Sequence, residues 1–407
     1  MPETREKVYA YRWVVLAVFA LANLAIQVLW ICYAPISSIA VEYYGVSQLQ
    51  VGMLAMVFMI VYVPISIPVS WLIDTLGYRK AVSIGVVMLG VFGLLRAFFA
   101  SNFGLVMAAT VGLGLAQPFL LNAVSTVAGR WFPIQERATA SGLALVASFI
   151  GIAIGQVTSP ILALRYGIPT MAMIFGILAA VSAALFLVFT RDAPLTPPCP
   201  ADQTERALVL DGLKSMLKME DIWLLLYAFL VGMGIFNGVS TWIAAITEPK
   251  GFSPTQAGDL GALLLIGGIV GAVIIPALSD HLRQRKPFLL LGVGLSIPCL
   301  IGIIYAQPYW SVAVFMFLMG FFLNSLAPIG YQYAAEITFP APEGTSNGLL
   351  NLAGQCSVVF IYAMEFMKGR DGSFTISLWM LSGLMLVGCL LLLRMHESKL
   401  IRQAAQE

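Results

Sequence analysis

Charged residues are scarce in this sequence. Of 407 residues, only 10% are Asp, Glu, Lys or Arg, whereas 60% are hydrophobic; soluble proteins carry about 25% charge. A chain with so few charges cannot cover its own surface with polar groups, and its apolar residues extend over the whole length. The composition therefore excludes cytosolic enzymes, nucleic-acid binders, disordered tails and an ectodomain on a single anchor. The net charge of +2 is too small to imply an acidic partner.

Cysteine and histidine are also few. The five cysteines are odd in number and scattered, which argues against a disulfide framework, and none has metal-ligand spacing. We therefore expect no metal and no cofactor. There is no Asn-X-Ser/Thr sequon, which favours a prokaryotic inner (plasma) membrane over a glycosylated animal surface. The N-terminus lacks the pattern of a cleaved signal peptide, so we expect the first apolar segment to be retained.

Long apolar segments are abundant. A membrane-spanning helix needs about 20 mostly apolar residues, and the sequence contains twelve such segments joined by short connections, with one longer loop at 191–221. The twelve predicted spans are 12–41, 49–73, 81–100, 103–128, 138–164, 168–190, 222–247, 256–279, 287–306, 309–335, 345–366 and 374–394.

The positive charges indicate an orientation. With the N-terminus placed in the cytoplasm, 17 of the 22 Lys and Arg residues fall on the cytoplasmic side and 5 on the outer side. Cytoplasmic loops of membrane proteins carry this excess. Both termini are therefore predicted to be cytoplasmic.

The second half of the chain repeats the first at an offset of 206 to 207 residues, and each repeated feature lies at a helix-to-loop boundary. The matching segments are Gly45-Val46-Ser47 with Gly251-Phe252-Ser253, Asp74 and Arg79-Lys80 with Asp280 and Arg285-Lys286, and Phe132-Pro133 and Glu136 with Phe339-Pro340 and Glu343. Two parallel copies of six spans resemble the major facilitator architecture of secondary transporters. We therefore expect an all-α membrane protein with the major facilitator fold, in which twelve transmembrane helices form two pseudo-symmetric six-helix bundles.

Three domains follow from this division. We expect an N-terminal bundle at 1–190, a cytoplasmic linker at 191–221 and a C-terminal bundle at 222–407. The linker begins with a proline-rich, extended stretch. Leu210, Leu213 and Leu217 then share one helical face, which predicts a helix on the inner membrane surface.

The loop after the second span resembles the signature loop of major facilitators. It runs from Ser70 to Lys80 and contains Asp74, Gly77 and Arg79. A carboxylate there can meet the positive end of a helix and can be held by the neighbouring cations, which would stabilise the state closed to the cytoplasm. The copy in the second half favours a gate over an ordinary topology-setting loop. The predicted gating residues are Asp74, Arg79, Lys80, Asp280, Arg285, Glu136 and Glu343.

Ionisable residues are missing from the middle of the spans. Arg96 comes nearest, and we expect its long stem to carry the charge to the outer surface. Proton-coupled carriers normally keep an ionisable group inside the membrane, so the pattern argues against a buried carboxylate as proton carrier. The interior polar groups are neutral amides, hydroxyls and aromatics. They suit a neutral solute or a soft cation, because the Trp face binds quaternary ammonium groups well.

The sequence resembles the FLVCR (feline leukaemia virus subgroup C receptor-related) family of major facilitators across nearly all the spans. The segments that carry the likeness are Trp30-Ile31-Cys32-Tyr33, Tyr43-Tyr44-Gly45-Val46-Ser47, Tyr62-Val63-Pro64, Trp71-Leu72-Ile73-Asp74, Ala116-Gln117, Trp131-Phe132, Glu336-Ile337-Thr338-Phe339-Pro340 and Glu343-Gly344-Thr345-Ser346-Asn347-Gly348-Leu349-Leu350-Asn351.

The resemblance implies transport of choline and ethanolamine, with haem export also proposed for the family. It implies a Trp in span 1 and a Tyr in span 7 that enclose the ammonium, assisted by glutamines in spans 4 and 11. Trp30, Gln117 and Gln355 occupy three of these positions, but Asn237 stands where the family has Tyr. Half of the aromatic cage is therefore missing, and the amide favours a more polar ligand. No Cys or His lies where it could ligate haem iron. The predicted substrate-binding residues are Trp30, Gln117, Asn237, Gln355, Phe236, Tyr33 and Asn351.

These observations predict a secondary transporter that moves a small organic solute, an amine or choline-like compound, by alternating access. Two alternatives remain: a polyspecific drug or metabolite exporter of the same fold, and a membrane receptor without flux. The sequence shows no catalytic constellation, so we expect no enzyme activity. The expected partners are the solute and the lipid bilayer, with no nucleic acid, and we expect a monomer.

Overall fold

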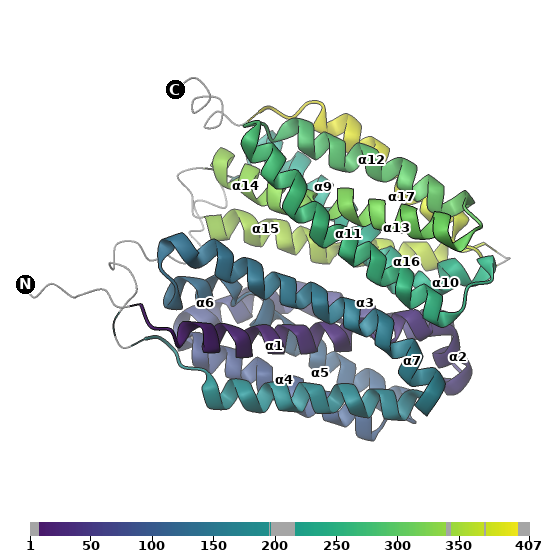
Figure 1. Cartoon of the computed structure of the whole chain (residues 1–407), viewed down its shortest axis with the longest axis horizontal. Coiled ribbons are helices and arrows are strands. Elements are labelled where there is room, and N and C mark those ends of the chain that lie inside the picture. The colour runs from purple at the N-terminus through teal and green to yellow at the C-terminus, as the bar shows by residue number, and fades with distance from the viewer. Residues whose placement is uncertain (1–7, 195, 197–215, 339–342, 370–371, 398–407) are drawn as a thin grey trace, which may run out of the picture. The chain divides into compact units, whose positions relative to one another are not determined.

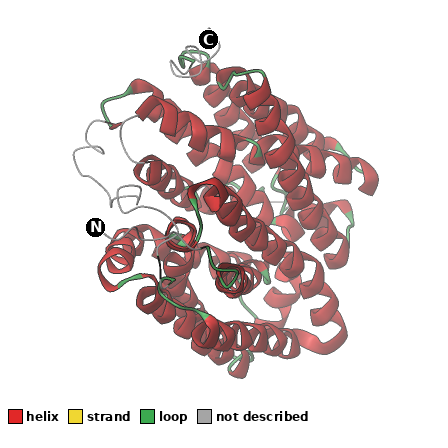
Figure 2. Ribbon diagram, turned by 60° about the vertical axis from the view of Figure 1, so that its left-hand side comes forward, coloured by secondary structure: helices red, strands yellow, loops and turns green. Residues whose placement is uncertain are grey.

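A computed structural model describes residues 8–194, 196, 216–338, 343–369 and 372–397. This part of the chain is helical, with short connections and no strand (Figure 2). The chain divides into two compact units, Met1–Ala207 and Leu208–Glu407. The boundary falls inside the segment 191–221 that the sequence assigns to the linker. Most of the surface helix predicted around Leu213 lies outside the described residues.

The first unit is a bundle of long apolar helices, several of them interrupted (Figure 1). Its elements are α1 (Arg12–Ile31), the 3-10 turn η1 (Ala34–Ile36), α2 (Ser37–Tyr44), α3 (Gln48–Leu76), α4 (Tyr78–Phe98), α5 (Phe103–Leu121), α6 (Val124–Trp131) and α7 (Ile134–Phe189).

The helix α7 contains two spans. Its apolar part, Ala140–Phe189, has 50 residues; at about 1.5 Å per residue it would be about 75 Å long, more than twice the bilayer core of about 30 Å. Gly167 has φ 82° and ψ 162°, which is not a helical conformation and which glycine tolerates best. The chain turns there, so the fifth and sixth predicted spans meet at this residue.

The second unit is a similar series of long and interrupted helices. It consists of α9 (Glu220–Thr241), α10 (Ile243–Thr247), η3 (Glu248–Lys250), α11 (Pro254–His281), α12 (Lys286–Tyr305), α13 (Tyr309–Asn324), α14 (Leu326–Thr338), α15 (Glu343–Cys356), α16 (Val358–Phe366) and α17 (Thr375–Leu392). Spans 4 and 10 are both broken, at Asn122 and at Ser325.

One sequence repeat has a direct structural cause. Gly45 ends α2 with φ 64°, and Ser47 then caps α3, accepting the Gln50 backbone N–H while the Gln50 side chain accepts the Ser47 N–H. Ser253 and Gln256 make the same reciprocal bonds at the start of α11. The repeated motif is therefore a left-handed helix stop followed by a capping box.

Close packing of α1 against α7 depends on a small residue. A Cβ added at Gly151 would lie 2.3 Å from the backbone oxygen of Leu24, so only glycine permits this approach. Within the first unit α7 also contacts α4, and Gly176 of its second span lies against Gly93 of α4.

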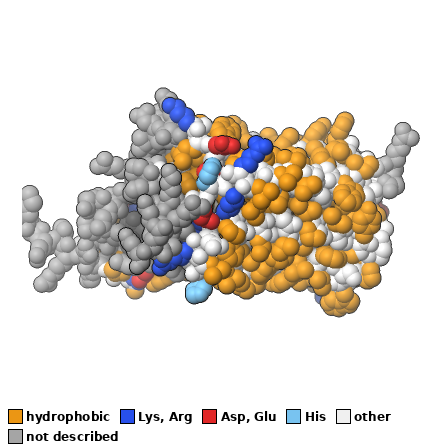
Figure 3. Space-filling view, turned by 90° about the horizontal axis from the view of Figure 1, so that it is seen from above, with side chains coloured by type: hydrophobic (Ala, Val, Ile, Leu, Met, Phe, Trp, Pro, Cys, Tyr) orange, Lys and Arg blue, Asp and Glu red, His pale blue; other side chains and the backbone are white. Residues whose placement is uncertain are grey.

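The surface of the spans suits lipid. Eleven helices in the described part are long and apolar enough to cross a membrane, one of them the double span of α7. Large apolar side chains such as Trp310 and Phe366 are exposed on them. Figure 3 shows charged side chains gathered at one end of the visible face, with hydrophobic side chains over the rest. Such a surface is stable only in a bilayer, so the chain is a multi-pass integral membrane protein.

Candidate functional site

In the first unit, Trp30 and Gln117 lie on two helices that touch each other, α1 and α5. The indole of Trp30 is 6% exposed, and its N–H donates to the Ala55 backbone oxygen of α3 at 3.1 Å, which fixes the ring. Gln117 is 4% exposed, and its Oε1 is buried without a hydrogen-bond partner among the described residues. An unpaired buried amide oxygen costs free energy, so it is a natural acceptor for a ligand.

Asn122, one turn after Gln117, has a different role. Its Nδ2 donates to the Ser66 backbone oxygen and hydroxyl at 3.1 Å and to the Ser70 hydroxyl at 3.0 Å, and its Oδ1 accepts from the Tyr62 hydroxyl. The amide is fully used in joining span 4 to span 2. Asn122 therefore forms a structural hydrogen bond between helices, which is the usual alternative to ligand binding for a single amide in a membrane span.

Tyr33 lies away from solvent, at 2% exposure, in the turn that ends α1. The guanidinium carbon of Arg96 lies 4.7 Å from its ring centroid, and its hydroxyl is 3.1 Å from that of Tyr44. Arg96 itself is only 2% exposed. The expectation that Arg96 reaches the outer surface is therefore wrong, because its side chain turns inward to the carbonyl end of α1.

In the second unit, Asn237 and Phe236 lie on α9, and both are buried. The Asn237 Nδ2 donates to the Ser357 hydroxyl at 3.3 Å, across to the break between α15 and α16. Gln355 lies half-buried just before that break, and the described residues give it no hydrogen bond. Asn351 is exposed, and its Oδ1 accepts from the hydroxyl of Tyr331.

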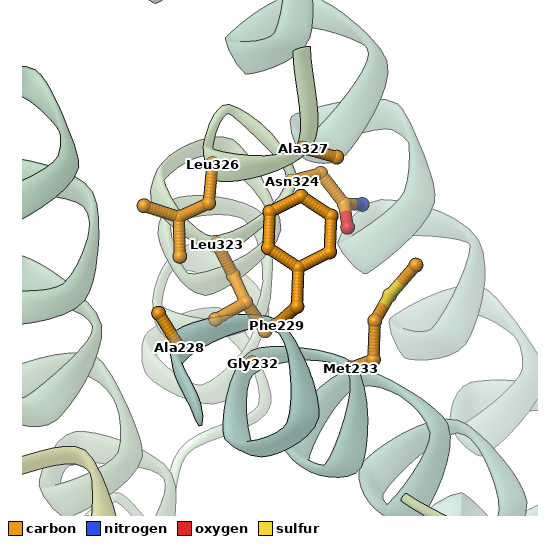
Figure 4. A pocket seen from close by; sticks show the side chains of 8 residues that line it. All are labelled: Ala228, Phe229, Gly232, Met233, Leu323, Asn324, Leu326 and Ala327. Carbon is orange, nitrogen blue, oxygen red and sulfur yellow. The ribbon is translucent and has the colours of Figure 1, made fainter. Parts of the chain in front are cut away.

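A small hollow opens between α9 and the α13–α14 break of the same unit (Figure 4). Phe229, Gly232 and Met233 of α9 form one wall, and Asn324 with its neighbours at the α13–α14 break forms the other. Asn324 is 9% exposed, and its Nδ2 is buried without a partner among the described residues.

Phe229 and Met233 are not among the predicted substrate-binding residues. The signal was present, because residues 229, 233 and 237 are spaced four apart and so share one face of a helix. The aromatic ring of Phe229 also lies 5.2 Å from that of Tyr331.

The predicted gate has partners that the sequence analysis did not name. In the first unit, Asp192 accepts the Arg79 backbone N–H at 2.9 Å and the Arg130 guanidinium at 2.6 Å. The Arg79 and Lys80 side chains are exposed. Gly77 separates α3 from α4 with φ 86°. Asp192 therefore caps the start of α4, and the side chain of Asp74 lies outside the description.

The second unit caps the matching helix in the same way. Glu397 accepts the backbone N–H groups of Arg285 and Lys286, at 2.9 and 3.1 Å. The Arg285 guanidinium pairs with Glu336 at 3.0 Å, and both side chains are buried, at 7% and 9% exposure. The side chains of Asp280 and Glu343 are not described. Each of these ion pairs lies within a single unit.

Glu136 also bonds within its own unit. Its carboxylate accepts from the Arg12 Nε at 3.0 Å and from Nη2 at 3.2 Å, a bidentate pair that ties α7 to the start of α1.

Known proteins resemble this chain closely enough to place it. The family model for the Major Facilitator Superfamily matches residues 19–361 and 243–407. The Choline/ethanolamine transporter FLVCR2 of Homo sapiens is 30% identical over 373 residues, 86% of this chain and 70% of that protein. Solute carrier family 49 member A3 of Danio rerio is 31% identical over 368 residues, 86% of this chain and 77% of that protein.

A solved structure shares the fold. A bacterial homologue of the human lysosomal transporter Spinster, inward-facing and unoccupied, superposes with a TM-score of 0.71 at 15% identity, covering 95% of this chain and 96% of that one. The relatives are transporters and not enzymes. The chain therefore belongs to the Major Facilitator Superfamily, as a secondary membrane transporter of a small organic solute related to the FLVCR proteins.

Proposed function

We propose that the solute is a small amine or amino alcohol of the choline and ethanolamine class, carried by alternating access. The observation that carries this proposal is the pairing, in one bundle, of a fixed Trp30 indole with an unpartnered buried amide oxygen on Gln117. The indole face attracts an ammonium group, by about 0.5–2 kcal/mol, and the amide oxygen accepts from an ammonium N–H or a hydroxyl.

The second bundle supports a polar ligand. Asn237 replaces the tyrosine that the FLVCR resemblance implies, and its Nδ2 is already engaged by Ser357. Its oxygen is left to accept from the solute, as is the amide of Gln355. A primary ammonium has N–H donors for these oxygens, whereas a trimethylated one has none. We therefore expect ethanolamine-like solutes to be preferred over choline.

Liposome counterflow tests the proposal. Purified protein is reconstituted with unlabelled ethanolamine or choline inside, and labelled solute uptake is measured for the wild type, Trp30→Ala and Trp30→Phe. We expect the wild type to take up labelled solute. Trp30→Ala should lower the affinity for the solute about 2- to 30-fold, and Trp30→Phe should lower it less. Trp310→Ala is the matched control, because Trp310 is 78% exposed.

The outcomes separate the alternatives. Uptake of many unrelated amphipathic cations at similar affinity would favour a polyspecific exporter. Solute binding without counterflow would favour a receptor. No binding of any amine would remove the proposed substrate class, while the assignment to a transporter family would stand.

Three further properties belong to the proposal. The bias of 17 against 5 cationic residues supports cytoplasmic termini, which thiol labelling of cysteines added at each end tests. The missing sequon supports a prokaryotic inner membrane, although the relatives reported above are animal proteins. We propose that one chain carries a complete pathway as a monomer, which its mass in detergent tests.

A further inference from the structure

Arg96 is a buried cation in the membrane part of the first unit. It lies in the last turn of α4 and is 2% exposed. Its Nη1 donates to the Leu29 backbone oxygen at 2.8 Å, and its Nη2 contacts the Cys32 sulfur at 2.8 Å. No carboxylate within the described residues pairs with it. Because burying a charge without a counter-ion is unfavourable, its contacts with α1 need an explanation beyond filling space.

The contacts lie at a break in the first span. The helix α1 ends at Ile31, and Cys32 and Tyr33 form a turn before η1 and α2. Pro35 has no N–H to offer the carbonyl of Ile31, and the last carbonyls of any helix lack internal partners. Arg96 supplies a donor to one of them, and its positive charge stands at the negative end of the helix dipole.

The same guanidinium also holds the far side of the break. It stacks over the ring of Tyr33 at 4.7 Å. The Tyr33 hydroxyl lies 3.1 Å from the hydroxyl of Tyr44, the last residue of α2, and Tyr44 donates to the Ala100 backbone oxygen at 2.7 Å. The break and both helices that flank it are thus tied to the end of α4.

Trp30 lies within this arrangement. It follows Leu29, whose carbonyl Arg96 holds, and its indole is fixed by Ala55 on α3. We propose that Arg96 is a positioning residue: it fixes the pivot at Cys32–Tyr33 about which the two parts of the first span turn, and so sets the orientation of Trp30 toward the solute. This inference rests on the proposed function, in which Trp30 contacts the solute.

Arg96→Met and Arg96→Lys test the proposal against a matched pair, Arg165→Met and Arg165→Lys. Arg165 also lies over a tyrosine ring, at 5.3 Å, but is exposed. In counterflow we expect Arg96→Met to raise KM about tenfold, equivalent to one lost oriented contact, with a smaller change in Vmax. Lysine can reach the Leu29 carbonyl as a point charge but cannot also contact Cys32 and stack on Tyr33, so it should restore only part of the affinity.

Cys32 reports the state of the pivot independently of transport. In a background with Cys199, Cys299, Cys356 and Cys389 replaced by Ser, Cys32 should resist a membrane-permeant maleimide, because it is 1% exposed. In Arg96→Met its labelling should rise several-fold, and ethanolamine should reduce it.

Each outcome bears on the proposal. Unchanged KM in Arg96→Met overturns it, whether or not labelling rises, because the residue would then be structural only. A variant that fails to melt cooperatively is replaced by Arg96→Lys, for which the same KM and labelling criteria decide. If the wild type transports no amine, the proposed function fails instead, and unchanged Cys32 labelling in Arg96→Met would then overturn the pivot.

Discussion

The substitution Asn237→Tyr tests whether residue 237 determines the binding preference between choline and ethanolamine. Asn237 is 9% exposed on α9, and its amide nitrogen donates to the Ser357 hydroxyl at 3.3 Å. The FLVCR resemblance implies a tyrosine at this position, which with the Trp of span 1 provides the aromatic groups for the ammonium. The substitution adds the missing aromatic face and removes an amide oxygen that can accept from a primary ammonium.

The magnitudes can be worked out for each solute. One cation–π contact contributes about 0.5–2 kcal/mol, so choline should bind about 2- to 30-fold more tightly. Ethanolamine gains the same face but loses an acceptor for its N–H groups, a hydrogen bond of about 0.5–1.5 kcal/mol. The ratio of choline to ethanolamine affinity should therefore rise. Loss of the Ser357 bond and the larger ring should lower the free energy of unfolding by about 1–3 kcal/mol.

Competition counterflow measures this ratio directly. Labelled ethanolamine uptake is inhibited by unlabelled choline in the wild type, in Asn237→Tyr and in Asn237→Leu, which removes the amide without adding a ring. A ratio that is unchanged in Asn237→Tyr, while Trp30→Ala still weakens uptake, would refute the placement of Asn237 against the ammonium. A ratio raised equally by Leu would show that the lost amide, and not the ring, is responsible.

Three other predictions concern stability. Gly151→Ala should lower the melting temperature, because the new Cβ would lie 2.3 Å from a backbone oxygen of α1. Gly142→Ala on the same helix has open space around its Cβ and should be neutral or stabilising. Equal changes in melting temperature would contradict the close contact. Glu336→Gln should lower the free energy of unfolding by up to about 3–5 kcal/mol, because it removes the carboxylate of a buried ion pair. Arg130→Gln breaks a pair whose side chains are exposed by 33% and 49% and should cost about 0–1 kcal/mol; similar losses would contradict the burial argument. Burial lowers the pKa of Lys250 below its ordinary 10.5. Between the lowered pKa and pH 10.5 the unfolded state binds more protons than the folded state, so the free energy of unfolding should rise with pH across that window. Lys250→Met should flatten this rise in thermal melts, and an unchanged slope would contradict the prediction.

The fold was predictable because the bilayer imposes a length on each apolar segment. The repeat was equally informative, since Gly45 and Ser47 and their copies perform the same local task, a helix stop followed by a cap. What length alone did not reveal was where spans break. The turns near Cys32 and Ser325 each precede a proline, Pro35 or Pro328, that offers no N–H to the carbonyl four residues earlier. Pro64 lies inside α3 without ending it, so the prolines alone do not show where a span breaks.

The offset between the two halves of the sequence predicted which residues occupy equivalent positions, but it did not predict their ion-pair partners. Arg130 and Glu336 are 206 residues apart and occupy equivalent places, yet one is a cation bound to Asp192 and the other an anion bound to Arg285. Both halves need an acceptor at the start of the helix after the signature loop, and the surrounding charges can supply it in either arrangement. Sequence spacing alone does not show which position in such an ion pair holds the cation and which the anion.

Arg96 shows the same limit of sequence patterns. A cation near the end of a span is ordinarily placed at the interface because snorkelling exposes it. Here the backbone carbonyl of Leu29 at the end of α1 and the ring of Tyr33 provide a polar environment inside the bundle. These acceptors exist only because the first span is broken, so the orientation of Arg96 follows from a tertiary feature.

The polar groups of the spans fall into two kinds, and the difference carries the functional argument. Asn122 uses its amide completely to join two helices, so it gains nothing from a ligand. Gln117 and Asn324 each bury a polar atom that has no partner in the described structure. Leaving such an atom unpaired costs about 1–3 kcal/mol, a cost that a bound solute can remove. A buried amide with such an atom, on a helix that contacts the helix of a fixed aromatic ring, is therefore a position where a transporter can bind its solute and still release it.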